Sequence, residues 1–258
     1  MNDALKAEWT KLRTVPSPLW LLAASVVLVI AAGAAAASTA TYPPFNAVQD
    51  TTKTALTGVL LGQAVIAILA VLTVTSEYSF GTIRLTLTAV PRRLELFAAK
   101  AVLLAGLTLV AGTVAVLGSL LAGRLILQAN GFTPAHGYAL VSLAHGSTVR
   151  AAVGSVLYLT LIALLALGAA TMLRDTAAAI GAALGALYLF PILGGVVSDP
   201  TWQRHLTQIG PMTAGLGIQT TVNVHSLTLT PWTGLGVSVL WAAGAMAAGG
   251  LLLSLRDA

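Results

Sequence analysis

The stretch ALTGVLLGQAVIAILAVLTVT, residues 55–75, is almost entirely apolar over its whole length. It contains no Asp, Glu, Lys or Arg, and a single glutamine is its only large polar side chain. A helix needs about 20 mostly apolar residues to cross the hydrocarbon core of a bilayer. The stretch is therefore predicted to be a transmembrane helix, and the similar stretches around it set the architecture.

Five further stretches share this length and composition. The chain of 258 residues is 57% hydrophobic and only 8% charged, whereas soluble domains carry about 25% charged residues. The charged residues fall outside the apolar stretches or at their rims. We predict an all-α integral membrane protein with one transmembrane domain over residues 1–258. Its six spans are expected at about 19–40, 55–75, 97–122, 151–173, 176–198 and 232–255.

The basic residues are distributed unequally between the two sides of the membrane. If the N-terminus is cytoplasmic, nine Lys and Arg residues lie on the cytoplasmic side and four on the other. Cytoplasmic loops are enriched in Lys and Arg, so both termini are predicted to be cytoplasmic. The net charge of +5 is then explained by the membrane, without a nucleic-acid partner.

The chain lacks the motifs of catalysis and of ligand binding. None of its four lysines follows a glycine, so there is no phosphate loop of the GxxxxGK[ST] type. It has no cysteine, and its four histidines show no metal-ligand spacing. Ion-coupled transporters usually keep an ionisable residue within a span, and we expect none here. The chain is predicted not to be an enzyme, with no catalytic residue, metal site or directly bound cofactor.

The segment EYSFGTIRLTLTAVPRR, residues 77–93, joins the second and third spans. We expect Ser76 to cap a new helix that has Glu77 in its first turn, where a carboxylate suits the helix dipole. Residues 83–88 alternate strictly and also fit a strand, but a lone strand beside lipid leaves backbone groups unpaired. A helix is therefore favoured. On residue types alone, a segment contacted by another protein and a loop that only fixes orientation are equally supported.

Polar and small residues elsewhere give local expectations. Gln63 is expected to form a hydrogen bond between helices, and Asp175 is expected to cap the fifth span after a two-residue hairpin. The Gly181–Gly185 pair is expected to allow close helix packing. Pro191 is expected to kink the fifth span.

The longest external segment runs from residue 199 to residue 231. The spacing of Trp202, Leu206 and Ile209 predicts a short amphipathic helix. Residues 211–218 are apolar enough to dip back into the membrane, provided that they pack against protein.

Two motifs together resemble a known family. Glu77, Gly81-Thr82, Arg84, Leu87, Pro91-Arg92-Arg93 and Lys100 are similar to the pattern E-x3-GT-x-R-x2-L-x3-PRR-x6-K of ABC transporter permeases of the type-two (ABC-2) exporter family. The opening Glu8-Trp9-Thr10-Lys11-Leu12-Arg13 resembles the EWxKLR segment of the same family. Six spans, cytoplasmic termini and a long last external loop fit this family along the whole chain.

The resemblance implies the permease subunit of an ATP-driven exporter in a bacterial plasma membrane. A short cytoplasmic coupling helix within residues 76–95 would dock into a separate ATP-binding subunit, which would bind ATP and Mg²⁺. The implied coupling residues are Glu77, Phe80, Gly81, Thr82, Arg84, Pro91, Arg92 and Arg93. An N-terminal interfacial elbow helix, apolar on one side, would comprise Leu5, Glu8, Trp9, Lys11, Leu12 and Arg13. A second permease copy or a paralogue would complete the transporter.

Two other classes of function fit the apolar spans. One is an ATP-independent six-helix channel or carrier, and the other is a membrane scaffold that transports nothing. Substrates in the resembled family range over drugs, antibiotics, lipids and polysaccharides, and the apolar span interiors favour a hydrophobic cargo. Co-purification with an ATPase that carries a phosphate loop would separate the exporter from both alternatives.

Overall fold

The computed structural model of the chain describes residues 5, 9–10, 16–41, 49–79, 93–136, 138 and 141–255. Over these residues the protein is helical and contains no strand. Six helices or helical segments are long and apolar enough to cross a membrane, which confirms the predicted all-α, six-span class. The main helices are α2 (Pro16–Thr39), α4 (Val59–Ser79), α6 (Arg93–Ala129), α7 (Gly146–Leu173), α8 (Thr176–Val196) and α11 (Pro231–Leu255).

Short helices lie between the long ones. The second span begins at Thr51, because α3 and η1 run directly into α4. The short helices are α3 (Thr51–Ala55), η1 (Leu56–Gly58), η2 (Pro134–His136), α9 (Pro200–Ile209), α10 (Pro211–Gly215), η3 (Leu216–Gln219) and η4 (Val224–Ser226). The predicted amphipathic helix at 202–209 is thus confirmed as α9.

Two helices extend well beyond their predicted ends. The 37 residues of α6 correspond to a length of about 55 Å at 1.5 Å per residue, whereas the hydrocarbon core is about 30 Å thick. α4 likewise continues past residue 75 to Ser79. Hydropathy locates a span, but a helix can continue into the polar region because its backbone remains hydrogen-bonded.

The extension of α4 corrects one prediction. Glu77 lies in the last turns of α4, so the expectation that Ser76 caps a new helix with Glu77 in its first turn is wrong. The polar run after residue 75 suggested a boundary, but no Gly or Pro interrupts the chain between Ala70 and Ser79. A change in polarity without a helix breaker leaves the helix intact.

Several predicted site residues lie outside the described part of the chain. They are Phe80, Gly81, Thr82, Arg84, Pro91 and Arg92 of the coupling segment, and Glu8, Lys11, Leu12 and Arg13 of the elbow. The choice between helix and strand for residues 83–88 falls there as well. Leu5 and Trp9 are helical, and Glu77 and Arg93 are described in full.

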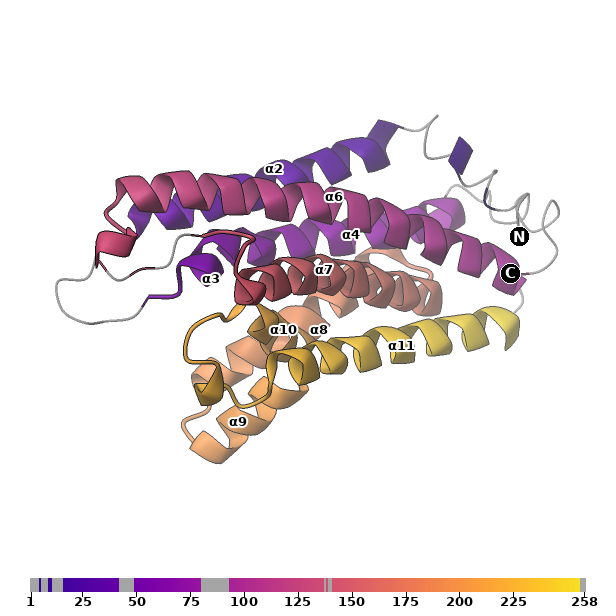
Figure 1. Cartoon of the computed structure of the whole chain (residues 1–258). Helices are drawn as coiled ribbons and strands as arrows, with labels where there is room; N and C mark the ends of the chain where they lie inside the picture. The colour runs from indigo at the N-terminus through magenta and orange to yellow at the C-terminus, as the bar shows by residue number, and fades with distance from the viewer. Residues whose placement is uncertain are drawn as a thin grey trace.

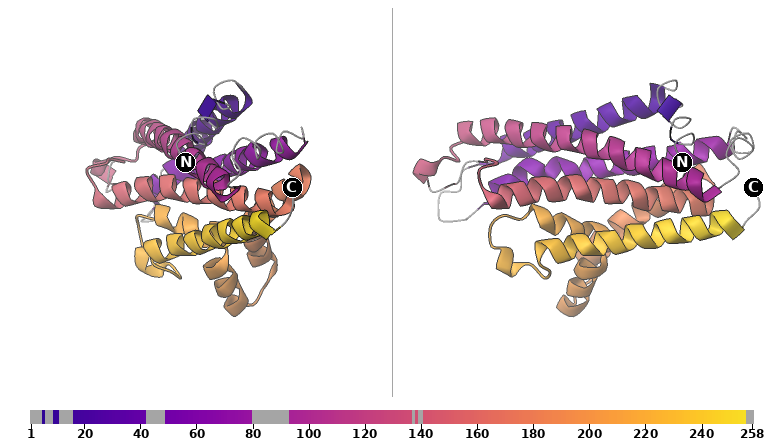
Figure 2. Two further views of the ribbon diagram at one scale, coloured as in Figure 1. Left: turned by 90° about the vertical axis from the view of Figure 1, so that its right-hand side faces the viewer. Right: turned by 45° about the vertical axis from the view of Figure 1, so that its right-hand side comes forward.

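The long helices run side by side, with α4 and α7 at the centre (Figures 1 and 2). α7 packs against α4, α6, α8 and α11, while α2 covers α4 and α6. α2, α6 and α8 begin at the end of the bundle where α4, α7 and α11 finish. We call this end the α4/α6 end, and the opposite end, where α9 lies, the α9 end.

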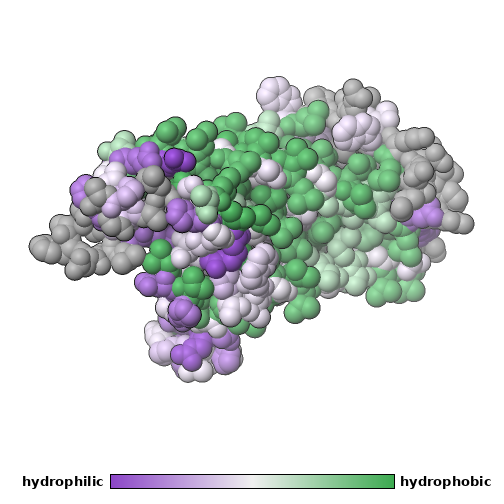
Figure 3. Space-filling view, viewed as in Figure 1, coloured by the Kyte–Doolittle hydropathy of each residue, from purple (hydrophilic) through white to green (hydrophobic). Residues whose placement is uncertain are grey.

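The surface is apolar over the middle of the molecule. In Figure 3 hydrophobic residues form a broad band, while hydrophilic residues gather at the α9 end of the bundle and on the protrusion below it. Large apolar side chains point outward within this band, such as those of Leu109, Val110, Val114, Leu117 and Leu121 in α6. A surface of this composition is solvated by lipid, so the chain is a multi-pass membrane protein.

Some helix crossings are close enough to require glycine. A Cβ at Gly58 would overlap the carbonyl oxygen of Val29 in α2, and one at Gly168 in α7 would overlap the backbone of Ala245 in α11. By contrast, a Cβ at Gly181 or Gly185 of α8 would meet nothing within 4 Å. The close packing predicted for that pair is therefore not formed within the described part of this chain.

The segment after α9 folds back onto the bundle. α10 and η3 pack against α7, α8 and α11, and Pro211, Ala214, Ile218 and Gln219 are buried. Residues 211–218 are therefore packed against protein, as a segment that dips back into the membrane must be.

Candidate coupling site at the α4/α6 end

Helix ends from every long element converge at the α4/α6 end. α4 finishes at Ser79 and α6 starts at Arg93, so the undescribed residues 80–92 connect two helices whose ends lie close together. The α7–α8 hairpin and the end of α11 adjoin them (Figure 1). Among the residues that the structure describes, polar side chains join these helices through the following three contacts.

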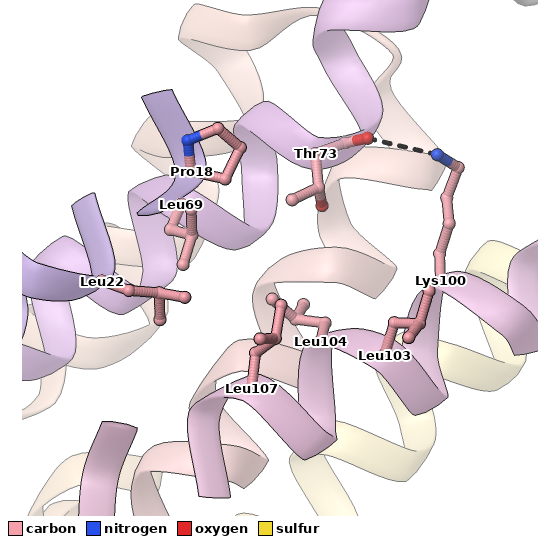
Figure 4. A pocket seen from close by; sticks show the side chains of 8 residues that line it. All are labelled: Pro18, Leu22, Leu69, Thr73, Lys100, Leu103, Leu104 and Leu107. Carbon is pink, nitrogen blue, oxygen red and sulfur yellow. Dashed lines mark hydrogen bonds between the residues drawn. The ribbon is translucent and has the colours of Figure 1, made fainter. Parts of the chain in front are cut away.

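The first contact is an ion pair between Glu77 and Lys100. Lys100 Nζ lies 2.7 Å from Glu77 Oε1, and the two side chains are only 9% and 8% exposed. Lys100 Nζ also donates to the carbonyl oxygen of Thr73 at 3.4 Å (Figure 4). Buried charges are tolerated when they are paired in this way. Glu77 reaches Lys100 because α4 continues past its predicted end to Ser79. The expectation that the span interiors hold no ionisable residue stays a prediction.

The ion pair lies between two small clefts, and Lys100 lines both. The first, drawn in Figure 4, separates α2 and α4 from α6; its other lining residues are Pro18, Leu22, Leu69, Thr73, Leu103, Leu104 and Leu107. The second lies towards α7 and α11 and is also lined by Val74, Glu77, Tyr78, Leu96, Phe97, Thr171 and Leu253. The apolar stem of Lys100 thus crosses a gap that other side chains leave partly unfilled.

The second contact joins the end of α4 to the α7–α8 hairpin. The guanidinium carbon of Arg174 lies 5.5 Å from the centre of the Tyr78 ring, in a cation–π arrangement. Arg174 has a left-handed backbone, with φ of 57°. Asp175 then caps α8 by accepting a hydrogen bond from Ala178 N at 2.8 Å, which confirms the predicted hairpin and cap.

The third contact joins α6 to α11. Arg93, the first residue of α6, donates from Nη1 to the carbonyl oxygen of Leu253 at 3.4 Å. Of the predicted coupling residues, Glu77 and Arg93 are the ones that the structure describes. They lie at the same end of the bundle, and each makes a contact with another helix.

Sequence reasoning missed part of this cluster. Tyr78 and Arg174 were not predicted as site residues, and Lys100 entered only as the last residue of the quoted motif. The motif did contain a hint of the ion pair. Its first residue, Glu77, and its last residue, Lys100, carry opposite charges and lie at the adjoining ends of two spans.

A second polar cluster lies in the centre of the bundle. Gln63 Nε2 donates to Tyr188 Oη at 3.3 Å and to Met212 Sδ at 3.2 Å, and its Oε1 accepts from Tyr158 Oη. Tyr188 Oη in turn donates to the carbonyl oxygen of Leu60 at 2.9 Å. The predicted interhelical hydrogen bond of Gln63 is confirmed, and it connects α4, α7, α8 and α10.

The described residues include no group of three or more His, Asp or Glu side chains that could hold a metal ion. Charged and aromatic side chains connect the ends of five helices next to the linker between the second and third spans.

This architecture defines a multi-pass helical membrane protein with a polar contact site at one end. A family model described as an ABC-2 family transporter protein matches residues 4–191. The match covers more than half of the chain, so the protein belongs to the ABC-2 transporter family. It is accordingly the membrane permease subunit of an ABC transporter, a transport subunit that is not itself catalytic. No curated protein matches this chain.

Proposed function

We propose that this permease couples ATP hydrolysis by a separate ATP-binding subunit to the export of an apolar substrate. Members of the family generally act with such a subunit, and the sequence contains no phosphate loop. The energy for transport therefore comes from a partner, which binds ATP and Mg²⁺. A second permease copy or a paralogue completes the transporter, and the membrane is the bacterial plasma membrane.

In this proposal residues 76–95 form the coupling segment. The residues that act in it are the coupling residues that the family pattern implies. The observation that carries the proposal is the ion pair between Glu77 and Lys100, the first and last residues of that pattern. A buried ion pair across the base of a linker costs desolvation energy. Its presence supports a linker whose conformation is needed for coupling, rather than a loop that only sets the orientation of the chain in the membrane.

The apolar character of the substrate is supported by a groove between α7, α8 and α11. Its volume is about 500 Å³, within the range of about 300–1,000 Å³ that small-molecule sites occupy. The lining residues are all apolar: Leu165, Ala169, Met172, Ala182, Ala186, Leu240, Trp241, Gly244, Ala245 and Ala248. Such a groove suits a drug-like or lipid-like molecule better than a polar one.

The test is co-purification from native membranes. A tagged chain is extracted in mild detergent, and the bound proteins are identified by mass spectrometry. We expect an ATP-binding protein with a phosphate loop, and its loss from the Gly81→Leu variant, in which a bulky side chain enters the coupling segment. Gly106→Leu is the matched control, because a Cβ at Gly106 of α6 meets nothing within 4 Å. Absence of any ATP-binding protein from the wild-type sample would contradict the proposal.

A further inference from the structure

The Glu77 side chain is buried within this chain. Its side chain is 9% exposed and already pairs with Lys100 at 2.7 Å. Glu77 is thus poorly placed to contact an ATP-binding subunit directly, although it begins the family pattern. Its role must be sought between α4 and α6.

The two helices joined by the pair make little direct contact elsewhere. α6 packs mainly on α2 and α7, and α4 packs mainly on α7 and α2. At the α4/α6 end the two clefts described above leave space on both sides of Lys100. The pair therefore bridges two helices that apolar packing holds only indirectly.

We propose that Lys100 is a positioning residue whose ion pair with Glu77 fixes the separation of the two helix ends that carry the coupling segment. The inference rests on the proposed function. With the pair formed, a push on the segment moves α4 and α6 together. With the pair absent, the same push moves one helix end relative to the other. The two clefts accommodate this movement, so the push is not passed on to the rest of the bundle.

A purely structural role makes a different prediction. Replacing a buried ion pair by apolar residues of similar volume is often neutral for stability, whereas removing one partner leaves an uncompensated buried charge. The double variant Glu77→Leu with Lys100→Met therefore separates the two roles. It keeps the fold, but it lacks the directional bond between the helix ends.

The experiment compares five variants of the full chain, each purified with its ATP-binding partner. They are Glu77→Lys, Lys100→Met, the apolar double variant, the charge swap Glu77→Lys with Lys100→Glu, and Lys53→Met as a control at an exposed lysine in α3. Two quantities are measured: the melting temperature of the permease in detergent, and the rate of ATP hydrolysis by the complex.

We expect both single variants at the pair to lose thermal stability and ATP hydrolysis. The apolar double variant should melt within about 4 °C of wild type, the shift expected for a small stability change in a protein of this size. Its ATP hydrolysis should nevertheless fall by at least about tenfold, which corresponds to about 1.4 kcal/mol of activation free energy. The charge swap should restore both quantities, and Lys53→Met should change neither.

Two outcomes would overturn the inference while the proposed function stands. Wild-type hydrolysis by the apolar double variant would show that the pair serves the fold alone. Normal hydrolysis by Lys100→Met, together with a failed charge swap, would show that Glu77 acts on the ATP-binding subunit itself. If no ATPase accompanies the wild-type chain, the proposed function fails and the coupling role falls with it. The melting temperatures still report on the pair in that case.

Discussion

The carboxylate of Asp50 holds Thr221, which follows it by 171 residues. Asp50 Oδ1 accepts a hydrogen bond from the Thr221 hydroxyl at 2.7 Å, and Oδ2 accepts from the backbone N–H groups of Thr221 and Val222. The same side chain caps α3 by accepting from Lys53 N at 3.0 Å. One residue thus connects the start of the second span to the segment that precedes the last span.

Replacing Asp50 by alanine should release this segment. Hydrogen bonds to a charged group contribute about 1.5–3 kcal/mol to stability, and Asp50→Ala removes several of them at once. Amide hydrogen exchange at Thr221 and Val222 should therefore be much faster than in wild type. Asp175→Ala is the matched control, because Asp175 caps α8 but makes no such distant contact with the residues that the structure describes. Its cost should be about 1 kcal/mol. Unchanged exchange in Asp50→Ala would contradict the assignment.

The central cluster predicts non-additive substitutions. Tyr158→Phe leaves Gln63 Oε1 without its donor in a fully buried site, and an unsatisfied buried group costs about 1–3 kcal/mol. Gln63→Leu should cost a similar amount, because it leaves the Tyr158 hydroxyl without an acceptor. The double variant should be less destabilised than the sum of the two singles, as measured by thermal unfolding in detergent. Strict additivity would show that the two side chains do not interact.

The crossing of α2 and η1 predicts a cost for a single methyl group. Gly58→Ala places a Cβ against the Val29 carbonyl oxygen, and overpacking of this kind costs about 1–3 kcal/mol. Gly106→Ala adds the same group where nothing lies within 4 Å, and it should be neutral or stabilising by up to about 1 kcal/mol. Equal effects of the two substitutions on the melting temperature would contradict the close crossing.

Topology can be tested without removing any native thiol, because the chain has no cysteine. Leu94 is exposed at the α4/α6 end, and Ser226 is exposed in η4 towards the α9 end. In intact cells an impermeant thiol reagent should label Ser226→Cys and leave Leu94→Cys unlabelled until the membrane is permeabilised. Labelling of Leu94→Cys in sealed cells would reverse the predicted orientation.

The spans were predictable because a transmembrane helix is specified by the composition of one continuous stretch of sequence. The run around Gln63 is apolar for the whole width of a bilayer, and the hydrogen-bonded role of Gln63 follows from placing an amide in that run. The ends of the spans were less predictable. α4 continues through Ser76 and Glu77, because a polar side chain does not stop a helix unless a breaker accompanies it.

The sequence motif located the segment that contains the candidate site, but it did not predict which side chains contact each other there. Glu77 and Lys100 were both recognised in the motif, yet their pairing depends on how far two helices extend and how they turn about their axes. The spacing of two residues in the sequence does not predict their contact when a linker separates the two helices. The same holds for Tyr78 and Arg174, which meet through tertiary packing. The roles of Phe80 to Arg92 and of the N-terminal elbow stay predictions.

ATP hydrolysis in reconstituted vesicles shows whether this permease responds to an ATP-binding partner. The purified chain alone should hydrolyse no ATP, whereas the chain with its partner should hydrolyse ATP at a rate that Gly81→Leu lowers and Gly106→Leu leaves unchanged. ATP hydrolysis by this polypeptide alone would rule out the proposed role as a permease that depends on a separate ATPase. A partner ATPase whose rate changes neither with the permease nor with Gly81→Leu would rule it out as well.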